Sequence, residues 1–169
     1  MATHRVYVER VSSNRTEAFV VALTLASLLV LAWRMNSRGL DRWGVLLLAV
    51  AAYLLFCALN YRTLLIQVTE RELSLSFGVV SWTIPLGNIA ACSPDDTSLW
   101  RIGGSGLHFT LLGGRYRAMF NFLEHPRLVI ALKARKGLVR DIAFSTTRPD
   151  ELLRLIQAGI VQDGAAGSP

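Results

Sequence analysis

Two long apolar stretches, separated by nine residues, lie in the first part of the chain. Residues 18–33 and residues 43–59 contain no charged side chain. At a rise of 1.5 Å per residue each stretch spans about 25 Å as a helix, close to the bilayer core of about 30 Å. Trp33 and Trp43 bracket the connection, as aromatic residues at a membrane interface do. The pattern predicts two transmembrane helices, at about residues 18–33 and 43–60.

A soluble helix pair and a signal peptide both fit these stretches less well. A buried helix pair in a soluble core is unusual for two uncharged stretches so close together. A cleaved signal peptide needs small residues at its end, whereas the first stretch ends in tryptophan, is followed by arginine and methionine, and comes after a leader that carries two glutamates. We therefore expect an integral, multi-pass membrane protein with an N-terminal flank over residues 1–16 and a transmembrane helical hairpin over residues 17–61.

Polar groups are sparse within the predicted spans. Neither span has an ionisable Asp, Glu, Lys, Arg or His, so the sequence contains no proton relay or ion path across the bilayer. Ala18, Ala22 and Ala26 recur every four residues, and small residues at this spacing let another helix approach closely. This helix-packing stripe fits either contact within the hairpin or contact with a second copy or another partner.

The charges flanking the spans leave the orientation open. Arg34, Arg38 and Arg42 lie between the two spans, whereas five arginines lie near their other ends. The count favours both termini in the cytoplasm, but the density of charge in the short connection favours the reverse.

A different pattern begins after residue 62. Apolar and polar residues alternate with a period of two, which indicates strands with one buried face. A uniformly apolar run at residues 128–132 is typical of a strand covered on both sides. The predicted strands cover residues 64–69, 73–77, 80–84, 107–111, 115–122, 128–132 and 138–144.

One helix is predicted to close this domain, which spans residues 62–160. Thr147 is expected to be the N-cap of a helix over residues 148–160, with Asp150 completing a capping box. Residues 161–169 are small and polar and are expected to form a disordered tail. The fold class is therefore α+β: a transmembrane hairpin, then an antiparallel β-barrel or sandwich capped by a C-terminal helix.

The second half of the chain resembles a known family. Three segments carry the likeness: HPRLVIAL, ARKGLVRDIAFS and TTRPDELLRLI, within residues 106–156. They resemble the bacterial pleckstrin-homology-like (PH-like) domains of small two-helix membrane proteins, and with the hairpin the resemblance covers about residues 15–160. It implies a cytoplasmic β-domain in a bacterial inner membrane protein, in a family whose functions are mostly unassigned.

No combination of residues indicates catalysis. Cys57 and Cys92 are poorly placed to pair, and the three histidines lack the spacing of metal ligands. The glycine-rich run at residues 103–106 lacks the Lys-Ser/Thr ending of a phosphate-binding loop. We expect no catalytic residue, cofactor, metal or small-molecule substrate. The net charge of +6 is dispersed, which suits a lipid surface better than nucleic acid.

The best candidate for a recognition surface is the pair Arg115 and Arg117. Residues two apart on a strand point to the same face, so both guanidinium groups are expected to meet an anionic lipid or a protein partner there. An ordinary solvated strand face is the competing interpretation. The hypothesis is a membrane-anchored, non-catalytic binding or scaffolding module for a protein partner, with self-association left open; the alternative is an anionic-lipid sensor.

Overall fold

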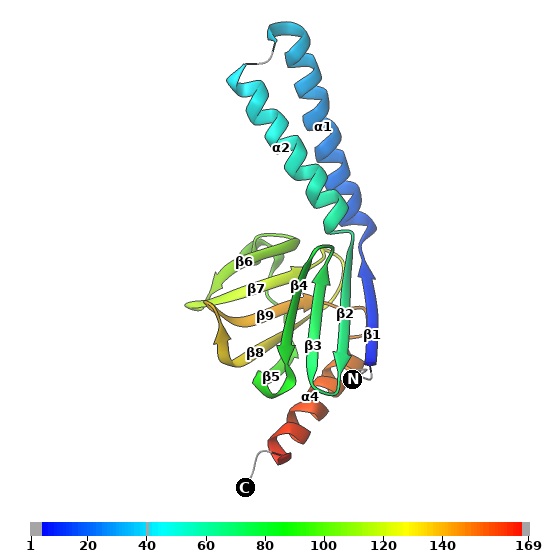
Figure 1. The fold of residues 1–169 in the computed structure, drawn as a ribbon, viewed down its shortest axis with the longest axis vertical. Helices are drawn as coiled ribbons and strands as arrows, with labels where there is room; N and C mark the ends of the chain where they lie inside the picture. Colours follow the sequence, from blue (N-terminus) through cyan, green and yellow to red (C-terminus); the bar gives the residue numbers. More distant parts are fainter. Residues whose placement is uncertain (1–4, 40, 167–169) are drawn as a thin grey trace.

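The computed structural model describes residues 5–39 and 41–166 and has two parts (Figure 1). A long helical hairpin projects from one end of a β-domain. The β-domain consists of two sheets, and a C-terminal helix lies at the end remote from the hairpin. The arrangement agrees with the α+β class predicted from the sequence.

The hairpin consists of α1 (Asn14–Arg38) and α2 (Arg42–Asn60), and it presents apolar side chains outwards. The most apolar windows of the two helices have mean hydropathies of 2.0 and 2.1, yet only 11% of each window is buried. Leu29 and Trp33, for example, are 71% and 70% exposed. Both helices are long and apolar enough to cross a membrane, and their outward apolar surface is consistent with the predicted hairpin.

The two helices contact each other through a narrow seam. Thr24 and Leu31 of α1 are buried, as are Gly44 and Ala51 of α2. The spacing of seven residues on each helix is that of a coiled-coil seam, and small residues on α2 allow close approach. The predicted stripe of Ala18, Ala22 and Ala26 is exposed on α1. The stripe therefore lies outside this seam, and its role in helix packing stays a prediction.

The first sheet contains a strand that the sequence pattern did not reveal. Its order is β1-β2-β3-β4, and all neighbours are antiparallel. The strands are β1 (Arg5–Ser12), β2 (Thr63–Thr69), β3 (Glu72–Phe77) and β4 (Val80–Pro85). The predicted N-terminal flank is thus largely an edge strand of the β-domain, in register with β2 from Arg5 opposite Thr69 to Ser12 opposite Thr63.

The hairpin is therefore inserted between two paired strands of one sheet. Only Ser13 separates β1 from α1, and only Tyr61 and Arg62 separate α2 from β2. The Ser13 hydroxyl accepts a hydrogen bond from the Thr16 N–H at 3.1 Å. Ser13 is therefore the N-cap of α1, which begins immediately after the strand. With connections this short, the hairpin and the β-domain form one continuous unit instead of two domains joined by a flexible linker.

The second sheet has the order β5-β8-β9-β7-β6. Its β7–β9 pair is parallel, which corrects the expectation of purely antiparallel pairing. β5 and the short helices η1 and α3 were not predicted. The elements are η1 (Leu86–Asn88), β5 (Ile89–Pro94), α3 (Leu99–Ile102), β6 (Gly106–Leu112), β7 (Arg115–Asn121), β8 (Arg127–Lys136) and β9 (Val139–Ser145).

The core lies between the two sheets. The rings of Phe77 and Phe120 stack with centroids 6.1 Å apart, and the Phe122 ring meets Phe77 edge-on at 5.2 Å. Helix α4 (Pro149–Ala166) covers one end of this core with the fully buried side chains of Leu152 and Ile156. It extends to Ala166 instead of ending at residue 160, so most of the expected tail is helical, while residues 167–169 lie outside the described chain.

The start of α4 differs from the predicted capping box. The Thr147 hydroxyl donates to Glu9 on β1, and the Arg148 N–H is satisfied by the Thr146 hydroxyl at 3.1 Å. The buried carboxylate of Glu9 thus holds the two threonines that precede the helix. Negative charge is favourable there because the N-terminal end of a helix carries a partial positive charge.

Candidate interaction surface

The two arginines predicted as a recognition surface lie on β7 in different environments. Arg115 is exposed at the first position of the strand. The Arg117 side chain is only 14% exposed, and its guanidinium lies 3.2 Å from Asp95 Oδ1 and 3.7 Å from Asp141 Oδ2. Arg117 therefore balances internal carboxylates, and of the two predicted cations only Arg115 presents its charge at the surface.

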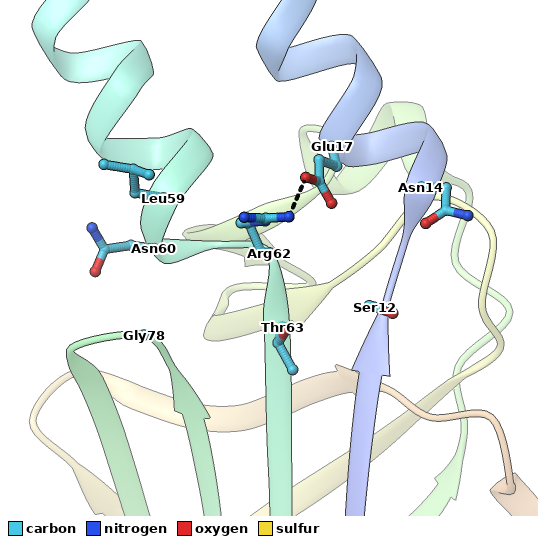
Figure 2. Close-up of a pocket in the computed structure, with 8 residues that line it drawn as sticks. All are labelled: Ser12, Asn14, Glu17, Leu59, Asn60, Arg62, Thr63 and Gly78. Carbon is cyan, nitrogen blue, oxygen red and sulfur yellow. Dashed lines mark ion pairs between the residues drawn. The ribbon is translucent and has the colours of Figure 1, made fainter.

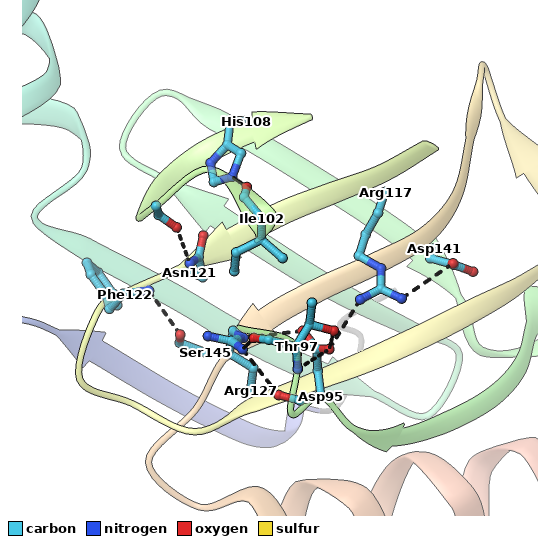
Figure 3. A network of polar contacts seen from close by, with 11 residues as sticks. Asp95, Thr97, Ile102, His108, Arg117, Asn121, Phe122, Arg127, Asp141 and Ser145 are labelled. Carbon is cyan, nitrogen blue, oxygen red and sulfur yellow. Dashed lines mark hydrogen bonds and ion pairs between the residues drawn. The ribbon is translucent and has the colours of Figure 1, made fainter. Parts of the chain in front are cut away.

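Asp95 is the centre of the buried polar network in Figure 3. Its carboxylate accepts hydrogen bonds from the Thr97 hydroxyl at 2.6 Å and from Arg127 Nε at 3.2 Å. Burial would raise the pKa of Asp95, but the hydrogen bonds from Thr97 and the charges of Arg117 and Arg127 outweigh burial and hold the pKa below its usual value. The network joins the end of β5 to β7 and β8, and it holds β7 close to the β6–β7 turn.

A shallow groove with a volume of about 360 Å³ lies next to this network. Three arginines line it: Arg101 from α3 and Arg115 and Arg117 from β7. Asp141 is the acidic residue among its lining groups. Because Arg117 is already paired, exposed Arg101 and Arg115 supply the charge that an external anion would meet.

The opposite face of the β6–β7 hairpin is apolar and exposed. Phe109 and Leu111 of β6 are 61% and 59% exposed, and Tyr116 of β7 is 45% exposed. Leu111 lies directly opposite Tyr116 in the ladder, so all three side chains share one face. Further along the same face, Phe120 is fully buried in the core. The exposed residues therefore extend the core face beyond the area that the first sheet covers.

Strand β6 is also an open edge. In the ladders of residues 5–39 and 41–166, β6 pairs with β7 on one side only, and β4 is likewise terminal in its sheet. The Trp82 ring of β4 lies 6.1 Å from the Phe109 ring, centroid to centroid. The side chains of β4 and β6 are therefore in contact, although the backbones of these two strands do not pair. An edge strand with unpaired N–H and C=O groups and exposed apolar residues is a template for another strand.

The site as a whole was only partly visible in the sequence. Arg115 was identified in the sequence. The ion pairs of Asp95 with Arg117 and Arg127 were not predicted, because Asp95 lies 22 and 32 positions from these partners. Phe109 and Leu111 were predicted as a buried face, since alternation alone does not say how far a covering sheet extends. Within the described residues, no three His, Cys, Asp or Glu side chains gather as metal ligands.

Comparisons with protein-family models, with curated proteins and with solved structures found no match for this chain. Its function is therefore inferred from the geometry of the hairpin, the groove and the open edge.

Proposed function

We propose that this chain is a membrane-anchored, non-catalytic binding module that presents the β6 edge to an extended segment of a protein partner. The observation that carries the proposal is the combination, on one strand, of an unpaired backbone edge with exposed Phe109 and Leu111. Soluble surfaces rarely leave such an edge unprotected unless it is used.

Anchoring is supported by the exposed apolar surface of α1 and α2. Pairing of β1 with β2 requires both ends of the hairpin to lie on the same side of the bilayer, which two crossings satisfy. The cytoplasmic side is our proposal on the basis of the PH-like resemblance. Two sheets and a terminal helix fit that resemblance, whereas the parallel β7–β9 pair and a strand before the hairpin depart from the expected pattern.

The geometry supports a particular chemistry for the proposed partner segment. Strand addition uses the main-chain hydrogen bonds of the edge and places alternate side chains on each face. On one face these side chains would meet Phe109, Leu111 and Tyr116, and on the other they would meet Arg101 and Arg115 in the groove. The fitting segment is extended and alternates apolar with acidic residues.

Anionic lipid is the second candidate for the arginines. Arg117 is engaged by two aspartates, which leaves fewer exposed cations than the sequence suggested. The β6–β7 turn also lies to the side of the domain and away from the base of the hairpin (Figure 1). We therefore propose protein at this groove.

The test is a selection of short random peptides on the full-length protein in lipid nanodiscs. We expect enriched peptides to alternate apolar with acidic residues, to lack proline at the pairing positions, and to slow amide hydrogen exchange in β6. Leu111→Asp and Arg115→Glu should each weaken peptide binding by at least about tenfold, as expected for losing about 1.4 kcal/mol of contact.

Two matched variants serve as controls. Val8→Asp changes an exposed valine on the edge strand of the other sheet, and Arg135→Glu reverses an exposed arginine on β8; both should leave peptide binding unchanged. No enriched peptide, or peptides indifferent to Leu111→Asp and Arg115→Glu, would refute the proposal. The lipid alternative would be favoured if Arg115→Glu left peptide binding unchanged but removed a contact between the β-domain and anionic lipids of the nanodisc.

A further inference from the structure

The end of the β-domain that faces the hairpin carries exposed apolar side chains at two separate turns. Val79, in the β3–β4 turn, is 77% exposed, and Leu123, which follows β7, is 38% exposed. Each turn is hydrogen-bonded to the base of a different helix of the hairpin. Both side chains therefore lie close to the ends of the helices that join the β-domain.

The β3–β4 turn is pressed against the end of α2. The Val79 N–H donates to Asn60 Oδ1 at 3.4 Å. Gly78 has φ +51°, and a Cβ at this position would lie 2.7 Å from the Asn60 backbone oxygen, so only glycine permits this close approach. The contact fixes the position of Val79 next to the last turn of α2.

The loop after β7 is held against the start of α1 in a similar way. The Leu123 N–H donates to the Thr16 hydroxyl at 3.5 Å, and Glu124 pairs with Arg15 at 3.3 Å. The His125 ring nitrogen Nε2 lies 2.8 Å from the Ser12 carbonyl oxygen. Leu123 is therefore tied to the same end of the domain as Val79, next to the other helix.

A polar pocket of about 470 Å³ lies under the base of the hairpin (Figure 2). Its charged groups are Arg62 and Glu17, paired at 2.8 Å, and the Arg62 side chain remains 58% exposed. Leu59, 65% exposed on the last turn of α2, lies at the pocket on the side of the helices. Glu17 contacts one guanidinium nitrogen, which leaves further N–H donors of Arg62 facing solvent.

We propose that this end of the β-domain is a second lipid-contact surface, in which Val79 and Leu123 enter the head-group region and Arg62 contacts a lipid phosphate. Apolar side chains at the interface and an arginine beside them are the chemistry by which surfaces bind bilayers. The occupant is lipid because the turns of Val79 and Leu123 are each tied to the end of one of the two exposed apolar helices. The inference rests on the membrane anchoring in the proposed function.

The test places an environment-sensitive fluorophore (NBD) on single cysteines in the full chain. Cys57→Ala removes one native thiol; the other, Cys92, is buried, and burial raises its pKa to about 12, so it stays unlabelled. Val79→Cys and Leu123→Cys are the test positions. The protein is reconstituted in vesicles of phosphatidylcholine and phosphatidylglycerol that contain lipids with a spin label near the head group.

The controls separate this inference from anchoring itself. Leu29→Cys reports the middle of α1, and Leu138→Cys reports a turn that is 68% exposed on the β-domain. We expect quenching at positions 79 and 123 to exceed that at 138 by roughly twofold or more, because only the former enter the interface. Bright, apolar-type NBD fluorescence at 29 with no quenching at 79 and 123 overturns the inference alone; water-like NBD fluorescence at 29 overturns the anchoring.

The contribution of Arg62 is tested in the same vesicles. Arg62→Gln should reduce quenching at position 79, because the turn loses an attachment to phosphate. Arg71→Gln, which removes an exposed arginine in the β2–β3 turn at the far end of the domain, should not. Equal quenching at position 79 in both variants and in the parent protein would remove Arg62 from the proposal.

Discussion

Glu9 of β1 and Thr147 at the start of α4 are 138 positions apart in the sequence and are joined by two hydrogen bonds. Glu9 Oε1 accepts from the Thr147 N–H at 2.6 Å and from its hydroxyl, while Oε2 accepts from Tyr7 at 2.8 Å and from Thr146 at 2.6 Å. Glu9 is only 4% exposed. This carboxylate therefore connects the strand before the hairpin to the helix that closes the domain.

Replacing Glu9 by Gln should destabilise the β-domain by about 1–3 kcal/mol, because the hydrogen bonds to a buried charged acceptor are weakened or lost. Thermal unfolding of the full-length protein in detergent, followed by circular dichroism, measures the change. Glu72→Gln, a partly exposed glutamate on β3 of the same sheet, is the matched control and should change stability little. Equal effects of the two substitutions would contradict a special role for Glu9.

The same carboxylate should make stability depend on pH. Burial raises the pKa of Glu9, but the hydrogen bonds from Thr146, Thr147 and Tyr7 outweigh burial, so the folded-state pKa lies below the ordinary value of 4.5. A lowered carboxyl pKa stabilises the fold fully above the unfolded-state pKa, and this contribution is lost as the pH falls through the folded-state pKa. The stability difference between the native protein and Glu9→Gln should therefore shrink below about pH 5.

Asp95→Asn should destabilise the domain by about 3–5 kcal/mol, since it leaves the guanidinium groups of Arg117 and Arg127 buried without their shared carboxylate. Asp96→Asn changes the neighbouring, exposed aspartate and should be nearly neutral. Denaturant unfolding monitored by tryptophan fluorescence compares the two. We also expect Asp95→Asn to speed hydrogen exchange in β7 and β8, and unchanged exchange there would contradict the network's role.

Ala51→Phe should destabilise the hairpin, because Ala51 is only 2% exposed in the seam between α1 and α2 and overpacking costs about 1–3 kcal/mol. Ala22→Phe places the same ring on the exposed side of α1 and should leave the monomer intact. Thermal stability in micelles distinguishes them. Oligomeric state, measured by light scattering, adds a second result: dissociation of an oligomer in Ala22→Phe alone would identify the exposed alanine stripe as a contact between copies.

Reporters fused at the two ends of the chain should report the same side of the membrane, because β1 and β2 must meet in one sheet. Paired fusions of a reporter active only in the cytoplasm and one active only outside it provide the measurement. Signals from opposite sides at the two ends would contradict the two-crossing hairpin, whichever side the domain occupies.

Most strands could be predicted because apolar and polar residues alternate within each of them. In β3 the buried positions alternate strictly, at Leu73, Leu75 and Phe77, and the period of two follows directly. The parallel contact of β7 with β9 could not be predicted, because β8 intervenes in sequence and local periodicity carries no information on which strands pair.

The two missed strands each break the apolar pattern for a physical reason. In β1 the buried face contains Tyr7, Glu9 and Val11, so its centre is a charged residue whose partners lie at the far end of the sequence. In β5 only Ile89 and Cys92 are buried, three positions apart, because a register irregularity interrupts the alternation between Ile89 and Ala91.

In the candidate site, too, the local features could be predicted and the tertiary contacts could not. Arg115 and Arg117 were found because two like charges on a predicted strand are visible in the sequence. Their different roles depend on Asp95, 22 positions from Arg117, and on Asp141 of a strand adjacent only in space. The charge that a partner meets is set by these tertiary pairings, which no local pattern contains.

The insertion of the hairpin between β1 and β2 imposes an order on biosynthesis. About 50 residues separate the two strands, so at about 5–20 residues per second the ribosome delivers β2 roughly 2–10 s after β1. During that interval β1 lacks its partner in the sheet, and it gains that partner only when both helices have been synthesised and the chain has returned to β1. Closure of the sheet thus reports that the hairpin has folded back on itself, and a nascent chain whose hairpin fails to form would keep an unpaired strand that quality-control proteases can recognise.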